Sequence, residues 1–356
     1  MKYTLLLNLC LIFASLLAAQ DTTSPRPFIE KGIDVWRIHS TTIGEDFTVY
    51  ALKPPGYDTS KQTVGVLYMT DGDWNMTVAM NCFNMLRQDY DTHEPLIVGI
   101  GYGTGENKRV RDLDPENGGP KFLEFIEKEV MPFVAKKYRT NDERAIYGYS
   151  MGGMFATYVL FTRPELFDKV LIGAPGNNGR LLMPAARAYK GSDLKNEVFV
   201  GVGAFERETT ANVDSFTTYM KQKKYPGLKI RSKITPEGGH GAALAQVMQY
   251  ALFYSYCVHH TPVAANPATY SRYTGNYVYY ENGKAVEEVN IFTKNNKLYF
   301  TWNNSRVEPE ELLASENNTF FTPAAERHTF RFTKVNNKYA LIIQVANDKE
   351  YVWEKK

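Results

Sequence analysis

The chain has 356 residues, of which 44% are hydrophobic and 22% charged, which is typical of a globular protein long enough for two folded units. Its formal net charge of +2 excludes the strongly basic surface that binding to nucleic acid or to an anionic membrane requires, so we expect neither partner. This charge balance favours a small substrate that is neutral or moderately charged.

The first twenty residues are typical of an export signal. One lysine precedes an apolar run from Leu5 to about Ala19, which is too short for a comfortable membrane span. We predict a signal peptide over residues 1–19 and a secreted mature protein, periplasmic or extracellular. A lipid anchor on Cys10 is the alternative, although larger residues precede it where small ones are expected. No later run is long enough for a membrane span.

Two cysteines, Cys82 and Cys257, remain after the predicted cleavage. In an oxidising compartment they could form a disulfide, but two cysteines in a chain of this size are also common as buried thiols. The predicted fold does not depend on which alternative holds.

The region from about residue 30 to 260 is predicted to form an α/β fold. It opens with two alternating runs around a glycine-containing turn, which predict an antiparallel edge. Short and mostly continuous apolar runs follow at 64–70, 95–103, 144–150, 169–176, 197–205 and 228–236. Continuous hydrophobicity is typical of strands covered on both faces. Segments with a helical apolar period, such as 120–138 and 239–257, separate these runs, so we predict a mainly parallel sheet with helices on both faces.

The pattern of apolar residues changes after the stretch "HHTPVAANPATY", residues 259–270. Beyond it, alternating runs rich in aromatic residues are broken by Asn-Gly and Asn-Asn turns, a pattern that indicates consecutive antiparallel hairpins. We therefore predict a small all-β domain over residues 266–356.

The stretch "AIYGYSMGGMF" places one serine, Ser150, between Gly148 and Gly152 where a strand-like run meets a helix-like run. A nucleophile on a sharp strand-to-helix turn needs glycine two residues away on each side, because larger side chains would collide with the adjoining strand and helix. The turn also places the serine at a helix N-terminus, which favours developing negative charge. The alternative is a glycine-rich turn with a solvated serine of no catalytic role.

A serine hydroxyl needs a base to become a good nucleophile, and His240 is the best candidate. It lies in "TPEGGHGAAL", a glycine-flanked loop between a strand and a helix, whereas the other histidines precede the serine or lie near or beyond the domain boundary. The acid that orients this base should end the strand between them, and Glu206 follows such a strand. Glu208 and Asp214 are the alternatives, and an exposed structural role for Glu206 also remains open.

An oxyanion hole requires two main-chain N–H groups. The residue after the serine, Met151, supplies one, and the loop "VLYMTDGDWN" is expected to supply the other through the N–H of Asp73. Trp74 would then form a wall of the substrate pocket. Arg109 and Arg111, in a later loop, could bind an anionic substrate or hold their own loop in place.

The motifs "LYMTDGDW", "RVRDLDPE", "YGYSMGGMFATYVLFTRPELF" and "EGGHG", in this order, resemble the esterase-D-like branch of the α/β hydrolases. That branch includes feruloyl and acetyl-xylan esterases, ferric-siderophore esterases and mycolyltransferase-like enzymes. The resemblance implies Ser150 as nucleophile, His240 as base and Asp73 as oxyanion donor. It leaves the carboxylate open, because some siderophore esterases of the branch use a Ser–His pair alone.

The C-terminal part, with "YTGNYVYY" and "KNNKLYF", resembles the small lipocalin-like β domain that follows some secreted bacterial hydrolases. This resemblance implies a barrel but not ligand binding, because a barrel of eight strands can be filled by its own side chains. A structural or substrate-positioning role is the one we expect.

The sequence therefore predicts a secreted serine esterase that acts on a small-molecule ester without a cofactor or metal. The adjacent pair His259 and His260 does not have the spacing of a metal site. The alternatives are an inactive hydrolase-fold binding protein, or an acyltransferase or peptidase that uses the same triad.

Overall fold

The computed structural model of the chain describes residues 32–303, 308–316, 319–323, 328–335, 338–345 and 350–356. The predicted signal peptide, residues 1–19, and Cys10 lie outside the described residues. No described helix is both long and apolar enough to cross a membrane.

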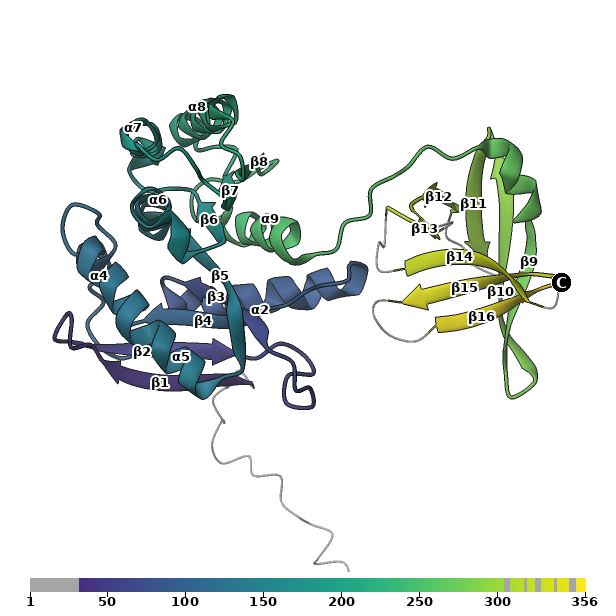
Figure 1. Cartoon of the computed structure of the whole chain (residues 1–356), viewed down its shortest axis with the longest axis horizontal. Helices are drawn as coiled ribbons and strands as arrows, with labels where there is room; N and C mark the ends of the chain where they lie inside the picture. Colours follow the sequence, from purple (N-terminus) through teal and green to yellow (C-terminus); the bar gives the residue numbers. More distant parts are fainter. Residues whose placement is uncertain (1–31, 304–307, 317–318, 324–327, 336–337, 346–349) are drawn as a thin grey trace, which may run out of the picture. The chain divides into compact units, whose positions relative to one another are not determined.

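An eight-stranded sheet forms the first part of the chain (Figure 1). Its strands are β1 (Ile33–His39), β2 (Asp46–Leu52), β3 (Val64–Met69), β4 (Leu96–Gly101), β5 (Thr140–Tyr149), β6 (Lys169–Gly173), β7 (Glu197–Val202) and β8 (Lys229–Ile234). They lie in the order β1-β2-β4-β3-β5-β6-β7-β8. Strands β1, β2 and β4 pair antiparallel, and all pairs from β4 to β8 are parallel. The mainly parallel sheet and its antiparallel edge are confirmed.

Helices cover both faces of this sheet. They are α2 (Gly72–Asp89), α3 (Arg109–Asp112), α4 (Gly119–Phe125), η1 (Ile126–Val130), α5 (Met131–Lys137), α6 (Met151–Thr162), η2 (Pro164–Leu166), η3 (Asn177–Gly179), α7 (Leu182–Ala188), α8 (Arg207–Lys223) and α9 (Leu244–Tyr256). The expected helix over 239–257 begins only at Leu244, because the glycine-rich residues before it form a loop instead.

Neighbouring residues of the central strands alternate between two hydrophobic cores. Val66 and Tyr68 of β3 join a core with helices α4 to α8, whereas Leu67 and Met69 join a second core with α2 and α9. Because each strand buries both of its faces, its sequence is continuously apolar rather than alternating. Cys82 and Cys257 both belong to the second core as buried thiols, so the disulfide alternative does not hold.

A closed antiparallel barrel follows in the C-terminal part (Figure 1). Its strands are β9 (Gly275–Glu281), β10 (Lys284–Lys294), β11 (Lys297–Trp302), β12 (Glu310–Ala314), β13 (Thr319–Phe321), β14 (His328–Val335), β15 (Lys338–Val345) and β16 (Glu350–Lys355), and β16 closes the barrel on β9. A short helix, η4 (Pro267–Arg272), precedes them. Closure leaves no unpaired strand edge. The predicted all-β barrel is confirmed, while the boundary between residues 260 and 266 stays a prediction.

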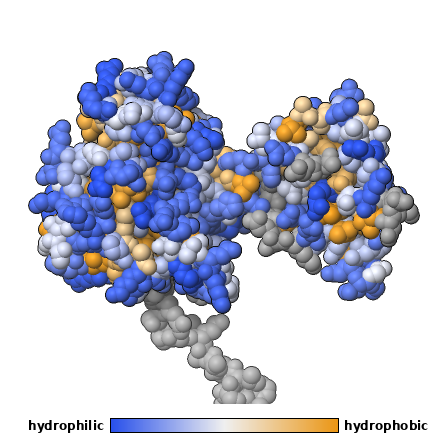
Figure 2. Space-filling model, viewed as in Figure 1, coloured by the Kyte–Doolittle hydropathy of each residue, from blue (hydrophilic) through white to orange (hydrophobic). Residues whose placement is uncertain are grey.

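The surface carries few large exposed hydrophobic side chains. On the face shown in Figure 2, hydrophilic residues predominate and hydrophobic residues lie in small groups. Phe205 at 68% exposure and Trp74 at 38% belong to the exposed hydrophobic residues, and both lie next in sequence to candidate site residues.

Candidate active site

Ser150 stands at the turn between β5 and α6, with backbone angles φ 60° and ψ −117°. A non-glycine residue rarely adopts positive φ, so the surrounding structure must hold this conformation in place. The Ser150 N–H donates to the Gly173 carbonyl oxygen at 2.9 Å, and the Ser150 carbonyl oxygen accepts from the Gly176 N–H at 2.7 Å. These bonds tie the strained residue to the end of the neighbouring strand β6.

The two glycines around Ser150 are required by packing. A Cβ atom on Gly148 would lie 2.0 Å from the carbonyl oxygen of Gly152, and one on Gly152 would lie 2.2 Å from Thr70 Oγ1. The first contact allows no side chain unless the backbone moves, and the second requires Thr70 to shift. The physical reason for the glycine pattern that we gave from the sequence agrees with this geometry.

A continuous hydrogen-bonded series joins Ser150, His240 and Glu206. His240 Nε2 lies 2.9 Å from Ser150 Oγ, and His240 Nδ1 lies 2.7 Å from Glu206 Oε2. The imidazole is 49% exposed and the carboxylate only 11%. The base is therefore open to solvent and substrate, whereas its carboxylate partner is largely enclosed.

The pKa of His240 is raised above 6.5, mainly because its ring bonds to Glu206, while partial burial acts in the opposite direction. Glu206 directly precedes α8, and its Oε1 also accepts from the Gly203 N–H at 3.2 Å. This second bond leaves the other carboxylate oxygen directed to the imidazole.

The alternative carboxylates do not contact His240, although Glu208 lines the cleft beside it. Glu208 pairs with Arg180 at 2.6 Å and accepts from Asn178 at 3.0 Å. Asp214 lies further along α8. The structure thus brings Glu206, and neither alternative, into contact with the His240 ring.

The two expected oxyanion donors both lie in first helical turns. Met151 is the first residue of α6, and Asp73 is the second residue of α2. The first N–H groups of a helix have no intrahelical acceptor, and the helix dipole makes this end favourable for an anion. Asp71, which precedes α2, has φ 56° and ψ 42°, so the backbone turns sharply where β3 leads into α2.

The side chain of Asp73 anchors the start of α2 to the residues that follow β4. Its carboxylate accepts from the N–H groups of Tyr102 and Gly103, both at 2.8 Å, and from the Tyr50 hydroxyl at 2.7 Å. A Cβ atom on Gly101 would lie 2.5 Å from this carboxylate, so the close approach needs glycine. We therefore find that Asp73 has a structural role in addition to the one expected for its N–H.

Both arginines of the following loop are engaged in ion pairs. Arg109 binds the buried Asp71 through Nε at 2.6 Å and Nη2 at 3.1 Å, and its guanidinium lies 5.6 Å from the Trp74 ring centroid. Arg111 pairs with Glu45 and Asp112, both at 2.7 Å. These contacts favour the loop-structuring alternative for both residues.

A cleft of about 450 Å³ opens beside the serine. Ser150, His240 and Glu206 line it together with polar residues that include Asn177, Asn178 and Thr209. Trp74, which we expected to form a wall of the substrate pocket, is not among the residues that line this cleft. The cleft has a polar wall on the side of α8, which suits a substrate with polar groups near the reacting bond.

Sequence reasoning missed three side chains that support the site. The Tyr149 hydroxyl donates to the His240 carbonyl oxygen, the Tyr50 hydroxyl binds Asp73, and Asp71 holds Arg109. Tyr149 lies inside the glycine-serine motif, but nothing in that motif indicates a bond to a residue 91 positions later.

The chain matches the family model described as "Putative esterase" over residues 40–331. This span covers most of the chain and includes strands β2 to β8 of the sheet and strands β9 to β13 of the barrel. The chain belongs to the Esterase family.

Two curated relatives of this chain are named as siderophore esterases. The chain is 28% identical over 175 residues to the ferri-bacillibactin esterase BesA of Bacillus subtilis, an alignment covering 42% of this chain and 60% of that protein. It is 30% identical over 171 residues to the siderophore enterobactin esterase of Emericella nidulans, covering 38% of this chain and 55% of the relative. The chain thus spans less than two thirds of the length of these relatives.

Solved structures show the same fold. An IroE-like serine hydrolase from Shewanella oneidensis aligns with TM-score 0.54 and 20% identity over 62% of this chain and 78% of that chain. The BES protein from Bacillus cereus aligns with TM-score 0.54 and 20% identity over 65% of this chain and 99% of that chain. Because both structures are only 20% identical to this chain, the likeness establishes its α/β fold and nothing beyond it.

Proposed function

We propose that this Esterase family member is a serine hydrolase of carboxylic esters that acts through Ser150, His240 and Glu206. The observation that carries the proposal is the pair of bonds made by one imidazole, from Nε2 to Ser150 Oγ at 2.9 Å and from Nδ1 to Glu206 Oε2 at 2.7 Å. A nucleophile, a base and an orienting acid need this order of contacts.

In the first half-reaction, His240 Nε2 takes the hydroxyl proton while Ser150 Oγ forms a bond to the ester carbonyl carbon. The negative charge moves onto the carbonyl oxygen, where the N–H groups of Met151 and Asp73 are the proposed donors. Collapse of this intermediate breaks the bond to the alcohol oxygen, which receives the proton from His240. An acyl group then remains on Ser150.

In the second half-reaction, water attacks the acyl group. His240 takes a proton from the water, and the tetrahedral intermediate collapses to release the carboxylic acid and return the proton to Ser150 Oγ. Throughout, Glu206 stabilises the protonated imidazole and holds Nδ1–H in place. Residues of this chain supply every proton transfer, so the mechanism proceeds with no cofactor.

The relatives' names and the polar cleft together favour esters of polar molecules. The two curated relatives are named as esterases of siderophores, and the cleft beside Ser150 carries side-chain amides from Asn177 and Asn178. A lipid ester would find few apolar partners there. We therefore propose a polar small-molecule ester as substrate, with siderophore esters as the first to examine.

We also propose that the protein is exported. The apolar run before Ala19 carries this part of the proposal, and it lies outside the described residues. Mass spectrometry of the mature N-terminus after expression would locate the cleavage. Exported protein with an intact Met1 would contradict the cleavage, and protein retained inside the cell would contradict the export.

The decisive experiment is covalent labelling of the purified chain by a fluorophosphonate. We expect the label on the peptide that carries Ser150, because the activated hydroxyl attacks phosphorus as it attacks a carbonyl. Ser150→Ala should prevent labelling and abolish hydrolysis of p-nitrophenyl esters while leaving the melt unchanged. A variant that keeps more than about a tenth of the activity would contradict the assignment.

A substrate screen then separates the possible reactions. Feruloyl, acetyl-sugar and triscatecholate esters report on the acid and alcohol groups, and added acceptor alcohols or peptides report on acyl transfer and peptidase activity. Labelling of Ser150 without turnover of any ester would favour the transferase reading, whereas absence of both would favour an inactive binding protein.

A further inference from the structure

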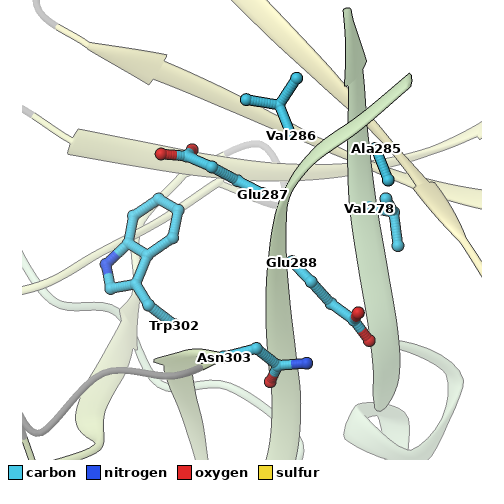
Figure 3. Close-up of a pocket in the computed structure, with 7 residues that line it drawn as sticks. All are labelled: Val278, Ala285, Val286, Glu287, Glu288, Trp302 and Asn303. Carbon is cyan, nitrogen blue, oxygen red and sulfur yellow. The ribbon is translucent and has the colours of Figure 1, made fainter. Parts of the chain in front are cut away.

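The pocket on the barrel and the cleft beside Ser150 differ in the charge of their walls. The barrel pocket, of about 740 Å³, has two glutamate side chains and no cationic side chain among its described lining residues (Figure 3). The cleft beside Ser150 also has two glutamates, Glu206 and Glu208, but its wall contains Arg207 as well. Only the second wall therefore has a cation that could pair with an anionic ligand.

Both glutamates of the cleft already have partners. Glu206 Oε2 lies 2.7 Å from His240 Nδ1, whereas Glu208 pairs with Arg180 at 2.6 Å and accepts from Asn178 at 3.0 Å. The bond to Arg180 lowers the pKa of Glu208, so this carboxylate is ionised at neutral pH and its charge is offset by the arginine. Neither glutamate is free to pair with a further cation.

Arg207 has no carboxylate partner in the part of the chain that the structure describes. The residue is exposed and lines the cleft. By contrast, Arg109 and Arg111 are both bound to carboxylates. A guanidinium can bind a carboxylate through two parallel hydrogen bonds. The donors of Arg207 are therefore available to a ligand in the cleft.

The first turn of α8 provides main-chain donors to the same cleft. Arg207, Glu208 and Thr209 are the first three residues of this 17-residue helix, and all three line the cleft. The first main-chain bond of the helix joins the Thr210 N–H to the Glu206 carbonyl oxygen at 2.8 Å, so the three earlier N–H groups have no acceptor within the helix. The Glu206 side chain does not cap them, because it is directed to the candidate base. A helix end of this kind favours negative charge.

A buried hydroxyl adds an independent donor. Thr209 is 3% exposed and lines the cleft, and its hydroxyl makes no hydrogen bond to a described residue. The buried threonines Thr157 and Thr217 instead donate to the carbonyl oxygen four residues earlier in their helices, at 2.9 and 2.8 Å. A buried hydroxyl without a partner costs free energy, which a ligand oxygen in the cleft would recover.

We infer that this cleft binds a carboxylate group of the ester substrate, held by the Arg207 guanidinium, the Thr209 hydroxyl and the first N–H groups of α8. The site rests on the proposed ester hydrolysis at Ser150 and specifies a substrate class for it. Glu206 connects α8 to the His240 ring, and the departing alcohol receives its proton from that ring. The carboxylate therefore belongs to the alcohol part of the ester.

Other ester classes match the cleft less well. A cationic group would be repelled by Arg207 and by the N-terminal end of α8, and it could pair with Glu206 or Glu208 only by displacing the partner of that carboxylate. A neutral group could accept from the Thr209 hydroxyl but would leave the charge of Arg207 unpaired. A carboxylate matches the guanidinium, the hydroxyl and the helix end together.

The test uses the full chain and three phenyl acetates that differ in the charge of the alcohol part. These are 4-acetoxybenzoate, which is anionic, 4-acetoxybenzamide, which is neutral, and 4-acetoxyphenyltrimethylammonium, which is cationic. All three transfer the same acetyl group to Ser150. The measured quantity is kcat/KM for the anionic ester divided by kcat/KM for the neutral ester. Comparing this ratio between the wild type and a variant cancels the intrinsic reactivity of each ester.

Substitutions at two residues locate the bound carboxylate. Arg207→Gln should lower the ratio by about tenfold through loss of a charge-assisted hydrogen bond. Thr209→Val should lower it by about threefold through loss of the hydroxyl, whereas Thr209→Ser keeps a hydroxyl and should retain the ratio. Because Arg207 is exposed, Arg207→Gln tests the site even if a change at the buried Thr209 disturbs folding.

Two further variants test whether charge at this position decides the ratio. Glu208→Gln should raise it, because this change removes a negative charge from the cleft wall and frees Arg180. Arg187→Gln is the matched control, because Arg187 is exposed on α7 and is not among the residues that line the cleft. The control removes the same charge from the surface and should leave the ratio unchanged.

The inference is overturned if Arg207→Gln changes the ratio no more than Arg187→Gln does. It is also overturned if Glu208→Gln lowers the ratio, or if Arg207→Gln lowers kcat/KM for the cationic ester as much as for the anionic one. Hydrolysis of the esters by the wild type with any of these results would leave the proposed function standing without this substrate class.

Failure of the proposed function has a different signature, in which the wild type hydrolyses no ester and a fluorophosphonate does not label Ser150. Saturation-transfer NMR of 4-hydroxybenzoate with the full chain would then still test the carboxylate site. Weaker binding to Arg207→Gln than to the wild type would support the site, and equal binding would overturn it.

Discussion

The Tyr149 hydroxyl donates a hydrogen bond to the main-chain carbonyl oxygen of His240. Their rings are also in contact, with centroids 5.3 Å apart. Tyr149 is the last residue of β5 and directly precedes Ser150, so the strand that positions the candidate nucleophile also anchors the loop of the candidate base. That loop needs an anchor, because glycines stand on both sides of His240 and permit many backbone conformations.

Replacing Tyr149 by Phe should lower kcat between about threefold and tenfold with little change in KM, because one hydrogen bond of about 1 kcal/mol would be lost. The ring contact with His240 remains, so the base would be loosened rather than displaced. Steady-state kinetics on a p-nitrophenyl ester measure this change, and a thermal melt separates it from unfolding.

Tyr147→Phe is the matched control for this prediction. Tyr147 lies two residues earlier on β5, is 1% exposed, and its hydroxyl has no partner among the described residues. Removing that hydroxyl should leave kcat unchanged and should not reduce stability. Equal losses of kcat in both variants would show that any change in β5 disturbs the site and that the bond to His240 has no special role.

Glu206→Gln should lower kcat by roughly two to four orders of magnitude with a smaller effect on KM. Glutamine preserves the shape but presents an amide that cannot stabilise a protonated imidazole and can hold the ring in the wrong tautomer. Asp214→Asn is the control, since Asp214 lies along α8 and away from the His240 contacts. A mild effect of both changes would instead indicate a Ser–His pair that works without a carboxylate, and the reverse pattern would assign the acid to Asp214.

The pH profile should report on His240. Its pKa is raised above 6.5, chiefly by Glu206, and only the neutral imidazole can accept the serine proton. The kcat/KM of the wild type should therefore fall as the pH drops through this raised pKa. Glu206→Gln removes the main cause of the increase, so the acidic limb of its residual activity should move to lower pH.

The contact between Glu206 and His240 should also stabilise the folded protein. This stabilisation should be largest at acidic pH, where kcat/KM is lowest. A group whose pKa is raised in the folded state contributes stability below its ordinary pKa of 6.5 and loses that contribution as the pH rises through the raised value. The melting temperatures of the wild type and Glu206→Gln should consequently differ more at acidic pH than at alkaline pH, as long as Glu206 is ionised.

The kinetic profile gives the contrary outcome for both predictions. If kcat/KM of the wild type and of Glu206→Gln fell at the same acidic pH, Glu206 would not control the pKa of His240.

The sequence predicted those features that depend on local chain properties. Continuous apolar runs identified the parallel strands because both faces of the sheet are covered. The glycines around Ser150 identified the turn because a Cβ atom on Gly148 would collide with Gly152, four residues later. Alternating aromatic residues with Asn-Gly turns predicted the antiparallel hairpins, and the resemblance to lipocalin-like domains implied the barrel that these hairpins form. In each case the residue types within one stretch of the sequence determine the structure that this stretch forms.

Features that depend on the approach of distant segments were not predictable. The bonds of Tyr149 to the His240 loop and of Tyr50 to Asp73 join residues far apart in sequence, and a tyrosine in a strand looks the same whether its hydroxyl has a partner or not. The β-bulge of β10, in which Val286 is the extra residue between Ala285 and Glu287, could not be predicted either. One additional residue in a polar hairpin leaves no distinctive sequence pattern.

A chain truncated at residue 265 should fold and keep its activity on small chromogenic esters. The stretch "TPVAANPATY" has two prolines and small residues without an apolar period, as expected of a linker. The two cores of the sheet draw their buried residues from Phe47 to Cys257, and the barrel core draws its own from Tyr270 to Trp353. Because Ser150, Glu206 and His240 all precede the cut, turnover of p-nitrophenyl esters should persist. Soluble expression with a cooperative melt and near-normal turnover would support two independent folding units, whereas an insoluble product, or one without a cooperative melt, would show that the sheet needs the barrel to fold.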